Sequence, residues 1–179
     1  MTTSEQAILK TGSWPLDTAH SAVNFTVRHL GISKVRGRFN RFETTFVVDE
    51  SGAATVSATV HLDSFDTGNA DRDAHVRSAD LLHVEQRPTL TFTATEPVRI
   101  AEDFQVTGHV TIGDQTHPVT LDVEWGGIQE FPATGDRHIG FTATSTLKRT
   151  DFGIGTAIPA AMLSDKIAIE LDIQLIEPK

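Results

Sequence analysis

Apolar and polar side chains alternate along most of the chain. Val23, Phe25 and Val27, for example, are separated from one another by polar residues. Successive side chains of a β-strand point to opposite faces, so this period of two predicts a strand with one apolar and one polar face. Seven further runs share the period: 42–48, 56–62, 90–94, 104–112, 119–125, 139–147 and 167–175. The pattern therefore predicts eight strands.

The connections between these runs are mostly short. Glycine-containing pairs and single glycines between alternating runs predict turns at Gly52, Gly113-Asp114 and Gly126-Gly127. Parallel strands require long crossovers, so the short gaps predict antiparallel pairing. Phe39 and Phe42 are out of phase with each other, and we expect a β-bulge near Asn40 to restore the alternation.

Two segments interrupt the alternation. Residues 66–88 are polar and rich in aspartate, and they predict a short helix from Asp71 to Ser78 with Asn69 or Asp71 as its N-cap. Residues 149–165 contain glycine, proline and several apolar residues. We expect this second segment to form a loop that buries part of its apolar side chains.

The predicted elements favour an all-β fold. Eight long antiparallel strands, each with one apolar face, can close into a barrel or pack as two layers. Eight strands closed into a barrel leave an interior just wide enough for side chains or one slender ligand. We expect an extended eight-stranded antiparallel barrel with a short helix and a covering loop, and a sandwich is the alternative. Residues 13–179 would form this single domain, preceded by a flexible lead over residues 1–12.

Composition narrows the classes of function. The chain has 179 residues and no cysteine, which excludes disulfides, thiolate chemistry and cysteine zinc sites. Its formal charge of −9 opposes binding to nucleic acid and to anionic lipid surfaces, and we expect no basic patch to offset it. The first residues lack the pattern of a secretory signal, and no apolar run is long enough to span a membrane. We therefore expect a cytoplasmic protein without stable membrane insertion.

Asp17, His20 and Ser21 are the three residue types of a hydrolase triad. Neighbouring residues on a strand point to opposite faces, so His20 and Ser21 cannot meet there, and no G-x-S-x-G motif is present. We interpret Asp17 and Ser21 as side chains that cap backbone groups where a strand begins.

The histidines and the charged cluster give no specific motif. No H-E-x-x-H sequence occurs, so we expect no metal site. The charged residues near the predicted helix (Asp71, Arg72, Asp73 and Asp80) fit two interpretations equally well. They form either a solvated helix with internal ion pairs or a polar rim beside the mouth of a pocket.

A family resemblance extends over most of the chain. It rests on W-x-L-D-x-x-H-S-x-V-x-F-x-V from Trp14, V-R-G-R-F from Val35, S-F-D-T-G-N-A-D-R-D-A-H-V-R-S-A-D-L-L from Ser64, P-T-L-T-F from Pro88 and K-R-T-D-F-G-I from Lys148. With these motifs the chain resembles the YceI-like family of polyisoprenoid-binding proteins. The resemblance implies a lipocalin-like barrel, often dimeric, that holds an isoprenoid chain in its lumen and has no established catalysis.

The resemblance and the alternation together predict a carrier or store for an amphiphilic isoprenoid, either a polyprenyl lipid or an isoprenoid quinone. It would need no further cofactor, and its partners would be this ligand and a second copy of the chain. An enzyme using Asp17, His20 and His75, or a non-liganded structural domain, is the alternative. The predicted ligand-binding residues are Phe25, Val27, Phe39, Phe46, Val56, Ala58, Leu81, Leu82, Phe92, Ala94, Phe104, Val106, Gly108, Phe141, Ala143, Phe152 and Ile154, with Arg72, Asp73 and His75 at a polar mouth.

Small residues recur on the predicted inner faces. Ala58, Ala94, Gly108 and Ala143 each lie within an apolar run, and a ring of them would leave room for a slender chain. The alternative is that neighbouring phenylalanines fill this space, because cores alternate large and small side chains. If the ring is open, Gly108→Leu and Ala143→Phe should block the ligand at little cost in stability.

Overall fold

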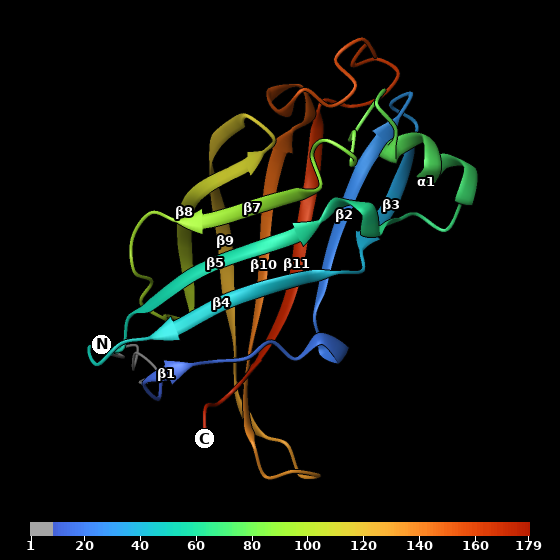
Figure 1. Ribbon diagram of the computed structural model, residues 1–179. Helices are drawn as coiled ribbons and strands as arrows, with labels where there is room; N and C mark the ends of the chain where they lie inside the picture. Colours follow the sequence, from blue (N-terminus) through green and yellow to red (C-terminus); the bar gives the residue numbers. More distant parts are fainter. Residues whose placement is uncertain (1–8) are drawn as a thin grey trace.

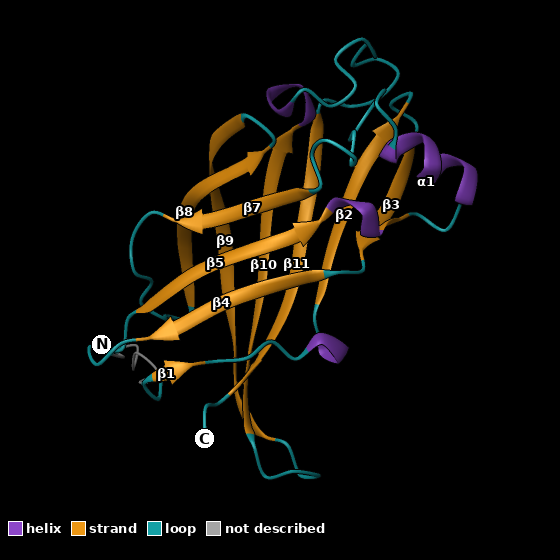
Figure 2. Ribbon diagram, in the orientation of Figure 1, coloured by secondary structure: helices purple, strands orange, loops and turns teal. Residues whose placement is uncertain are grey.

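The computed structural model describes residues 9–179 and is dominated by β-strands, with one short α-helix (Figures 1 and 2). All eight predicted runs form strands. The elements are β1 Gly12–Ser13, η1 Thr18–His20, β2 Ala22–His29, β3 Ser33–Phe39, β4 Phe42–Val48, β5 Ala54–His61, η2 Leu62–Ser64, β6 Phe65–Asp66, α1 Ala70–Arg77, β7 Thr89–Ala94, β8 Asp103–Ile112, β9 Gln115–Glu130, β10 Arg137–Lys148, η3 Arg149–Phe152 and β11 Lys166–Ile176.

The strands form one antiparallel sheet of eleven strands in the order β1-β4-β5-β7-β8-β9-β10-β11-β2-β3-β6. The sheet curls on itself, so that β4, β5 and β7 cross in front of the long strands β9, β10 and β11 (Figure 1). The predicted all-β, antiparallel, lipocalin-like architecture is confirmed. It differs in having eleven strands rather than eight, and in curling into a half-barrel whose two edges are not joined by a continuous ladder.

The expected β-bulge near Asn40 is wrong, because the chain leaves one part of the sheet there and joins another. β3 pairs with β2 and β6, whereas β4 pairs with β5 and β1. Asn40 donates its backbone N–H to the carbonyl oxygen of Ser64 (3.2 Å). The change of phase between Phe39 and Phe42 therefore marks a corner between two strands.

The pair Gly126-Gly127 does not form the predicted turn. Both glycines lie inside β9, and the register between β9 and β10 shifts beside them, between Gly140 and Phe141. A Cβ on Gly126 would lie 3.0 Å from the carbonyl oxygen of Gly140, so a side chain here would crowd the backbone of β10. The β9–β10 hairpin continues beyond this bulge and projects from the lower end of the sheet in Figure 1. The turns expected at Gly52 and Gly113 are present.

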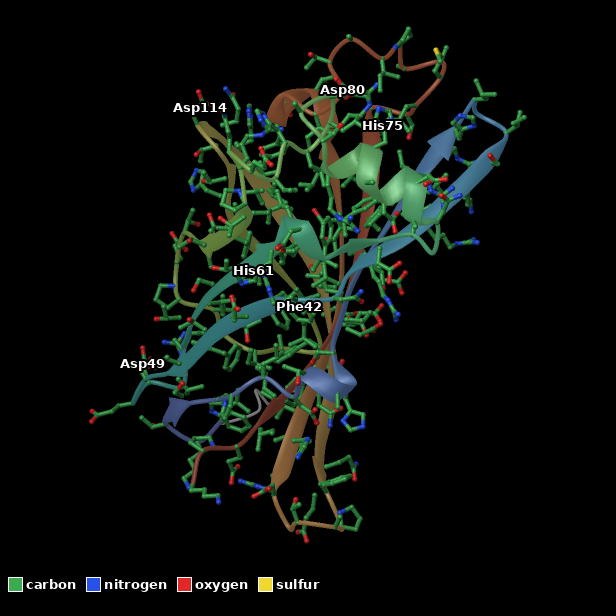
Figure 3. All side chains as sticks on the ribbon, turned by 45° about the vertical axis from the view of Figure 1, so that its right-hand side comes forward. Phe42, Asp49, His61, His75, Asp80 and Asp114 are labelled. Carbon is green, nitrogen blue, oxygen red and sulfur yellow. The ribbon has the colours of Figure 1, made fainter. Side chains whose placement is uncertain are left out.

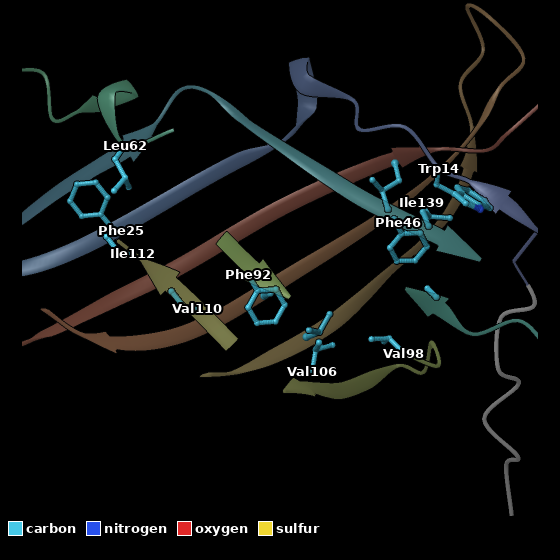
Figure 4. Close-up of a cluster of buried hydrophobic side chains, with 14 of the residues drawn as sticks. Trp14, Phe25, Phe46, Leu62, Phe92, Val98, Val106, Val110, Ile112 and Ile139 are labelled. Atoms are coloured by element: carbon cyan, nitrogen blue, oxygen red, sulfur yellow. The ribbon is translucent and has the colours of Figure 1, made fainter. Parts of the chain in front are cut away.

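Buried side chains close the two ends of the curled sheet. Trp14 and Ile139, each 1 % exposed, lie at one end, and Leu62 and Ile112 lie at the other (Figure 4). Trp14 also donates its backbone N–H to the carbonyl oxygen of Phe46 (2.9 Å), which ties the chain before β2 to the edge of β4. Leu9 is buried as well, at 3 % exposed, while residues 1–8 of the predicted lead lie outside the described residues.

The two segments that interrupt the alternation cover the second of these ends, as expected (Figure 2). α1 begins after Asn69, whose side chain accepts a hydrogen bond from the backbone N–H of Arg72. Phe152 and Ile154 of the second segment are 2 % and 9 % exposed. No helix within residues 9–179 has the length and apolar character needed to cross a membrane.

Two arginines hold the covering segments in place. Arg149 is 1 % exposed and donates hydrogen bonds to five backbone carbonyl oxygens, those of Ile154, Gly155, Ile158, Leu163 and Ser164. Arg87 donates to the carbonyl oxygens of Leu81, Leu82 and Phe152 and so joins the first segment to the second. The loops therefore have a fixed conformation, because each guanidinium satisfies carbonyl groups that lack β-sheet partners.

Candidate functional site

A cavity of about 190 Å³ lies inside the curled sheet, and the surface that it exposes is apolar. Inward-facing side chains from every strand except β1 and β6 line it, together with Val98 and Ile100 from the β7–β8 connection. The alternation that predicts the strands also explains this lining, because the apolar parity of each strand faces the interior. Phe92, Val106 and Phe46 in Figure 4 belong to these walls.

Nine of the predicted ligand-binding residues line the cavity: Phe39, Phe46, Val56, Ala58, Phe92, Phe104, Val106, Phe141 and Ala143. Three of them form an aromatic cluster, since the ring centroid of Phe141 lies 5.9 Å from that of Phe46 and 6.2 Å from that of Phe104. The structure therefore brings side chains that are far apart in the sequence into one apolar wall.

The other eight predicted residues do not line this cavity: Phe25, Val27, Leu81, Leu82, Ala94, Gly108, Phe152 and Ile154. Phe25 packs against Phe39 and Phe65, with ring centroids 5.6 and 5.1 Å apart. Leu81, Leu82, Phe152 and Ile154 belong to the covering segments and are buried. These side chains close one end of the interior, and their role is to cover the cavity.

The expected ring of small residues is not open at Gly108. It pairs with Ala94, and a Cβ on Gly108 would lie 2.6 Å from two ring carbons of Phe92 and 2.5 Å from the carbonyl oxygen of Thr93. The ring of Phe92 therefore occupies the space above Gly108, as the alternative interpretation expects for this position. Ala58 and Ala143 remain on the cavity wall.

The residues predicted for a polar mouth hold the first covering segment instead. Asp73 is 5 % exposed, and its carboxylate accepts hydrogen bonds from the backbone N–H and the hydroxyl of Thr67. Arg72 donates to the hydroxyl and carbonyl oxygens of Thr67. His75 lies 3.4 Å from Asp80 on the exposed side of α1, away from Phe42 at the start of β4 (Figure 3).

A polar group that the sequence analysis missed lies in the cavity wall. Thr44 occupies the inward parity of β4, between Phe42 and Phe46, and its hydroxyl is buried without a hydrogen-bond partner. The backbone of Arg41 bonds His61 of β5, and that of Asp49 bonds Ala53 just before β5. Because these hydrogen bonds alternate along an antiparallel pair, the backbone groups of Thr44 point away from β5. A single threonine among phenylalanines is the signal in the sequence, and the alternating pattern alone gives it no special role.

The cavity is partly open beside β4. Thr45 and Ser57 point to the opposite face from Thr44 and Ala58, yet all four line it. Within residues 9–179, β4 pairs on the side away from β5 only with β1, at Val47 and Val48, so no described strand covers the rest of this edge and we infer that the cavity opens past it. The surface that the cavity exposes is apolar throughout.

Asp17, His20 and Ser21 have structural roles. The carboxylate of Asp17 accepts a hydrogen bond from the backbone N–H of Ala19 and lies 2.8 Å from Nδ1 of His20. The hydroxyl of Ser21 instead donates to the carbonyl oxygen of Gln174 and accepts from its N–H. Burial acts to raise the pKa of Asp17, but its hydrogen bond and charge interaction with His20 hold that pKa below its ordinary value. The three side chains do not form a nucleophile–base pair.

The described residues contain no group of three histidine, aspartate or glutamate side chains placed to hold a metal ion. The expected capping roles of Asp17 and Ser21 are what the structure contains. The chemistry that this site offers is therefore apolar contact, with the hydroxyl of Thr44, unpartnered among these residues, buried in its wall.

The sequence profile of the YceI-like domain matches residues 14–175. The chain belongs to the YceI-like family. A UPF0312 protein of Pectobacterium atrosepticum is 37 % identical over 155 residues, which cover 86 % of this chain and 80 % of that relative. The matched range begins at Trp14 and ends at Leu175, two buried residues at one end of the sheet.

Solved YceI-like structures have the same fold. The YceI protein of Campylobacter jejuni is 29 % identical, with a TM-score of 0.74 over 85 % of this chain and 90 % of that one. A polyisoprenoid binding domain from Saccharophagus degradans, implicated in plant cell wall breakdown, gives a TM-score of 0.68 at 17 % identity, over 93 % and 99 % of the two chains. The second likeness shows a shared fold.

Proposed function

We propose that this YceI-like protein binds an isoprenoid lipid, a polyprenyl chain or an isoprenoid quinone, in the cavity and carries or stores it. The observation that supports the proposal is an apolar, partly open cavity inside the curled sheet, lined by side chains from most of its strands. Protein interiors ordinarily pack without voids of this size, so unfilled apolar space indicates a ligand. The polyisoprenoid binding domain that shares the fold supports the same class of ligand.

The size of the cavity favours a slender chain. It is somewhat larger than an engineered cavity of about 150 Å³ that accommodates benzene, and smaller than the roughly 300 to 1,000 Å³ typical of sites for drug-sized ligands. Transfer of one CH₂ group from water contributes about 0.8 kcal/mol, so a few isoprene units give ample driving force. We infer that part of the chain occupies the cavity while the remainder leaves through the opening beside β4.

The apolar walls do not by themselves make the site selective, because the tails of a membrane are equally apolar. Selectivity requires a polar feature, and the hydroxyl group of Thr44, buried in the cavity wall without a hydrogen-bond partner in the described part of the chain, supplies one. A quinone carbonyl or a polyprenol hydroxyl can form a hydrogen bond with it. This arrangement favours amphiphilic isoprenoids over plain hydrocarbons.

The decisive experiment is extraction of the gently purified protein with organic solvent, followed by mass spectrometry. We expect a stoichiometric isoprenoid lipid, and we expect the emptied protein to take up added quinone or polyprenol. Protein that is repeatedly free of lipid and also refuses both added ligands would contradict the proposal. Increasing the number of isoprene units should raise affinity only until the cavity is filled.

The enzyme alternative loses its geometric support. His20 lies beside Asp17, whereas His75 pairs with Asp80 near α1, so Asp17, His20 and His75 do not form one cluster. The family resemblance also implies a homodimer, which sedimentation of the purified chain would test. The cytoplasmic location expected from the sequence remains a prediction.

A further inference from the structure

Positive charge is concentrated on one exposed part of this acidic protein. The sequence has no acidic residue between Asp17 and Glu43, although the whole chain carries a charge of −9. Arg28 at the end of β2 and Lys34 and Arg36 on β3 all lie in this interval and are exposed. The expectation that no basic patch offsets the net charge is therefore wrong for this part of the surface.

Two lysines extend the same patch across the neighbouring strands. Lys148 and Lys166 face each other at the ends of β10 and β11, and Arg28 faces Lys34 across β2 and β3. The strand order β10-β11-β2-β3 places the four side chains in one row, which together with Arg36 we name the basic band. All five are exposed, and within residues 9–179 none of them forms an ion pair.

The repulsion between the side chains in this row lowers the stability of the fold, which indicates that the row has another role. Like charges directly opposite each other on paired strands are destabilising, and the basic band contains two such pairs. The nearby carboxylate of Asp165 is hydrogen-bonded by the backbone N–H and hydroxyl of Thr150, and its charge interaction with Lys148 offsets the repulsion at that end of the row only in part. The arrangement is therefore explained better by an anionic partner than by stability.

An exposed apolar tip lies next to the basic band. Ile32 is 83 % exposed, Leu30 50 % and Met162 51 %. The backbone N–H of Leu30 donates to the carbonyl oxygen of Met162 (2.9 Å), so the β2–β3 hairpin and the second covering loop form one tip. Leu30 also has a φ of 54°, a conformation that is unfavourable for leucine. Both loops lie at the upper end of the molecule in Figure 1.

We propose that this tip and the basic band dock the protein on an anionic membrane surface. The apolar side chains would enter the boundary between headgroups and acyl chains, while the five cations contact lipid phosphates. An exposed apolar tip favours a membrane over nucleic acid, which would use the cations but not Ile32. The covering loops that close the cavity would then face the bilayer.

Vesicle co-sedimentation of the lipid-free protein tests the proposal without relying on the cavity. We expect binding to vesicles of equal parts phosphatidylcholine and phosphatidylglycerol, weaker binding to pure phosphatidylcholine, and a decrease with added salt. Each cation at such a surface contributes about fivefold, or about 1 kcal/mol. The double variant Lys34→Gln/Arg36→Gln should therefore bind at least about tenfold more weakly, and Ile32→Ser about tenfold more weakly.

Matched controls test whether the location of the removed charges and apolar side chains matters, rather than their number. Lys10→Gln/Arg99→Gln removes the same charge elsewhere, and Phe131→Ser removes an exposed apolar side chain from the β9–β10 hairpin. Both controls should bind as the original chain does, and all variants should still take up added isoprenoid.

Four results would overturn the docking proposal while leaving the cavity proposal standing. The first is equal binding to both kinds of vesicle, and the second is an equal loss of binding in the controls. The third is that the original chain binds no vesicles and forms a dimer, and that Ile32→Ser dissociates this dimer. Comparable binding to double-stranded DNA that Ile32→Ser leaves unchanged would likewise assign the basic band to nucleic acid instead.

Discussion

Ser21 shows at the residue scale how the position of a side chain determines its chemistry. Its hydroxyl takes the place of a β-sheet partner for Gln174, donating to the carbonyl oxygen and accepting from the N–H. The neighbouring His20 is occupied with Asp17. His20 ends the 3-10 helix η1 and Ser21 lies between it and β2, rather than both lying on a strand as the sequence suggests. Ser21 and the backbone of Asp17 join β11 to the beginning of β2, and His20 contacts only Asp17 among the three residue types of the triad.

Ser21→Ala should lower the free energy of unfolding by about 1 kcal/mol, because the backbone N–H of Gln174 loses its partner, whereas its carbonyl oxygen keeps the backbone N–H of Asp17. Ligand uptake should change by less than about twofold, or roughly 0.4 kcal/mol. Urea denaturation and quinone loading measure the two effects, with Ser33→Ala at the exposed start of β3 as a control. A tenfold loss of loading at unchanged stability would show that Ser21 contacts the ligand.

The hydroxyl of Thr44, in contrast to that of Ser21, is buried without a hydrogen-bond partner in residues 9–179. Thr44→Val removes a buried polar group without a partner, so it should raise the free energy of unfolding of the empty protein by about 1 kcal/mol. If the hydroxyl contacts a ligand oxygen, loading of a quinone should fall while loading of a plain isoprenoid hydrocarbon stays the same. Thr45→Val on the outer face is the control, and a destabilised Thr44→Val would contradict the assignment.

Glycine and phenylalanine pair at the scale of the strands. The ring of Phe25 covers Gly37 on β3, and the ring of Phe92 covers Gly108 on β8. Each aromatic ring replaces the side chain that the glycine lacks, an arrangement that stabilises strands containing glycine. A glycine on the apolar face of a strand is therefore no indication of empty space in the interior.

Gly108→Leu should consequently destabilise the fold by about 1–3 kcal/mol or more, because a Cβ there meets Phe92 and the backbone of Thr93. This reverses the expectation that the substitution fills the lumen at little cost. Ala143→Leu adds side-chain volume on the cavity wall and should cost much less. Thermal unfolding distinguishes the two, and equal melting temperatures would show that Phe92 moves aside freely.

The whole molecule combines an apolar interior, two closed ends and an opening at the edge of β4. The cavity exists because the curled sheet places inward faces opposite one another at a distance that their side chains do not fill. Arg87 and Arg149 keep the covering loops fixed over one end. Access to the interior is therefore through the side at β4 unless these loops move.

Ala143→Phe tests the cavity itself. The added ring would occupy the cavity beside Phe141, so ligand loading should fall at least about tenfold, or about 1.4 kcal/mol. Filling a cavity commonly stabilises a protein by about 0.5–2 kcal/mol, which for this size corresponds to a rise in Tm of roughly 2–4 °C per kcal/mol. A large decrease in Tm without a selective loss of loading would indicate a filled core.

The sequence by itself determined most of the elements. The period of two identified eight of the eleven strands, the short gaps identified antiparallel pairing, and Asn69 or Asp71 marked the beginning of α1. It also identified nine residues of the cavity wall, because the parity of a strand assigns each side chain to a face. These features depend on neighbours in the chain and on backbone geometry, so the local pattern suffices.

Only the tertiary structure decided how the faces meet. The sequence did not reveal that the chain turns a corner at Asn40, that Phe92 covers Gly108, or that Thr44 is left without a partner. Nor did it reveal that Lys148 and Lys166 join Arg28 and Lys34 in one row. Each of these depends on which strands lie side by side, and register and curvature arise from contacts between residues far apart in the chain.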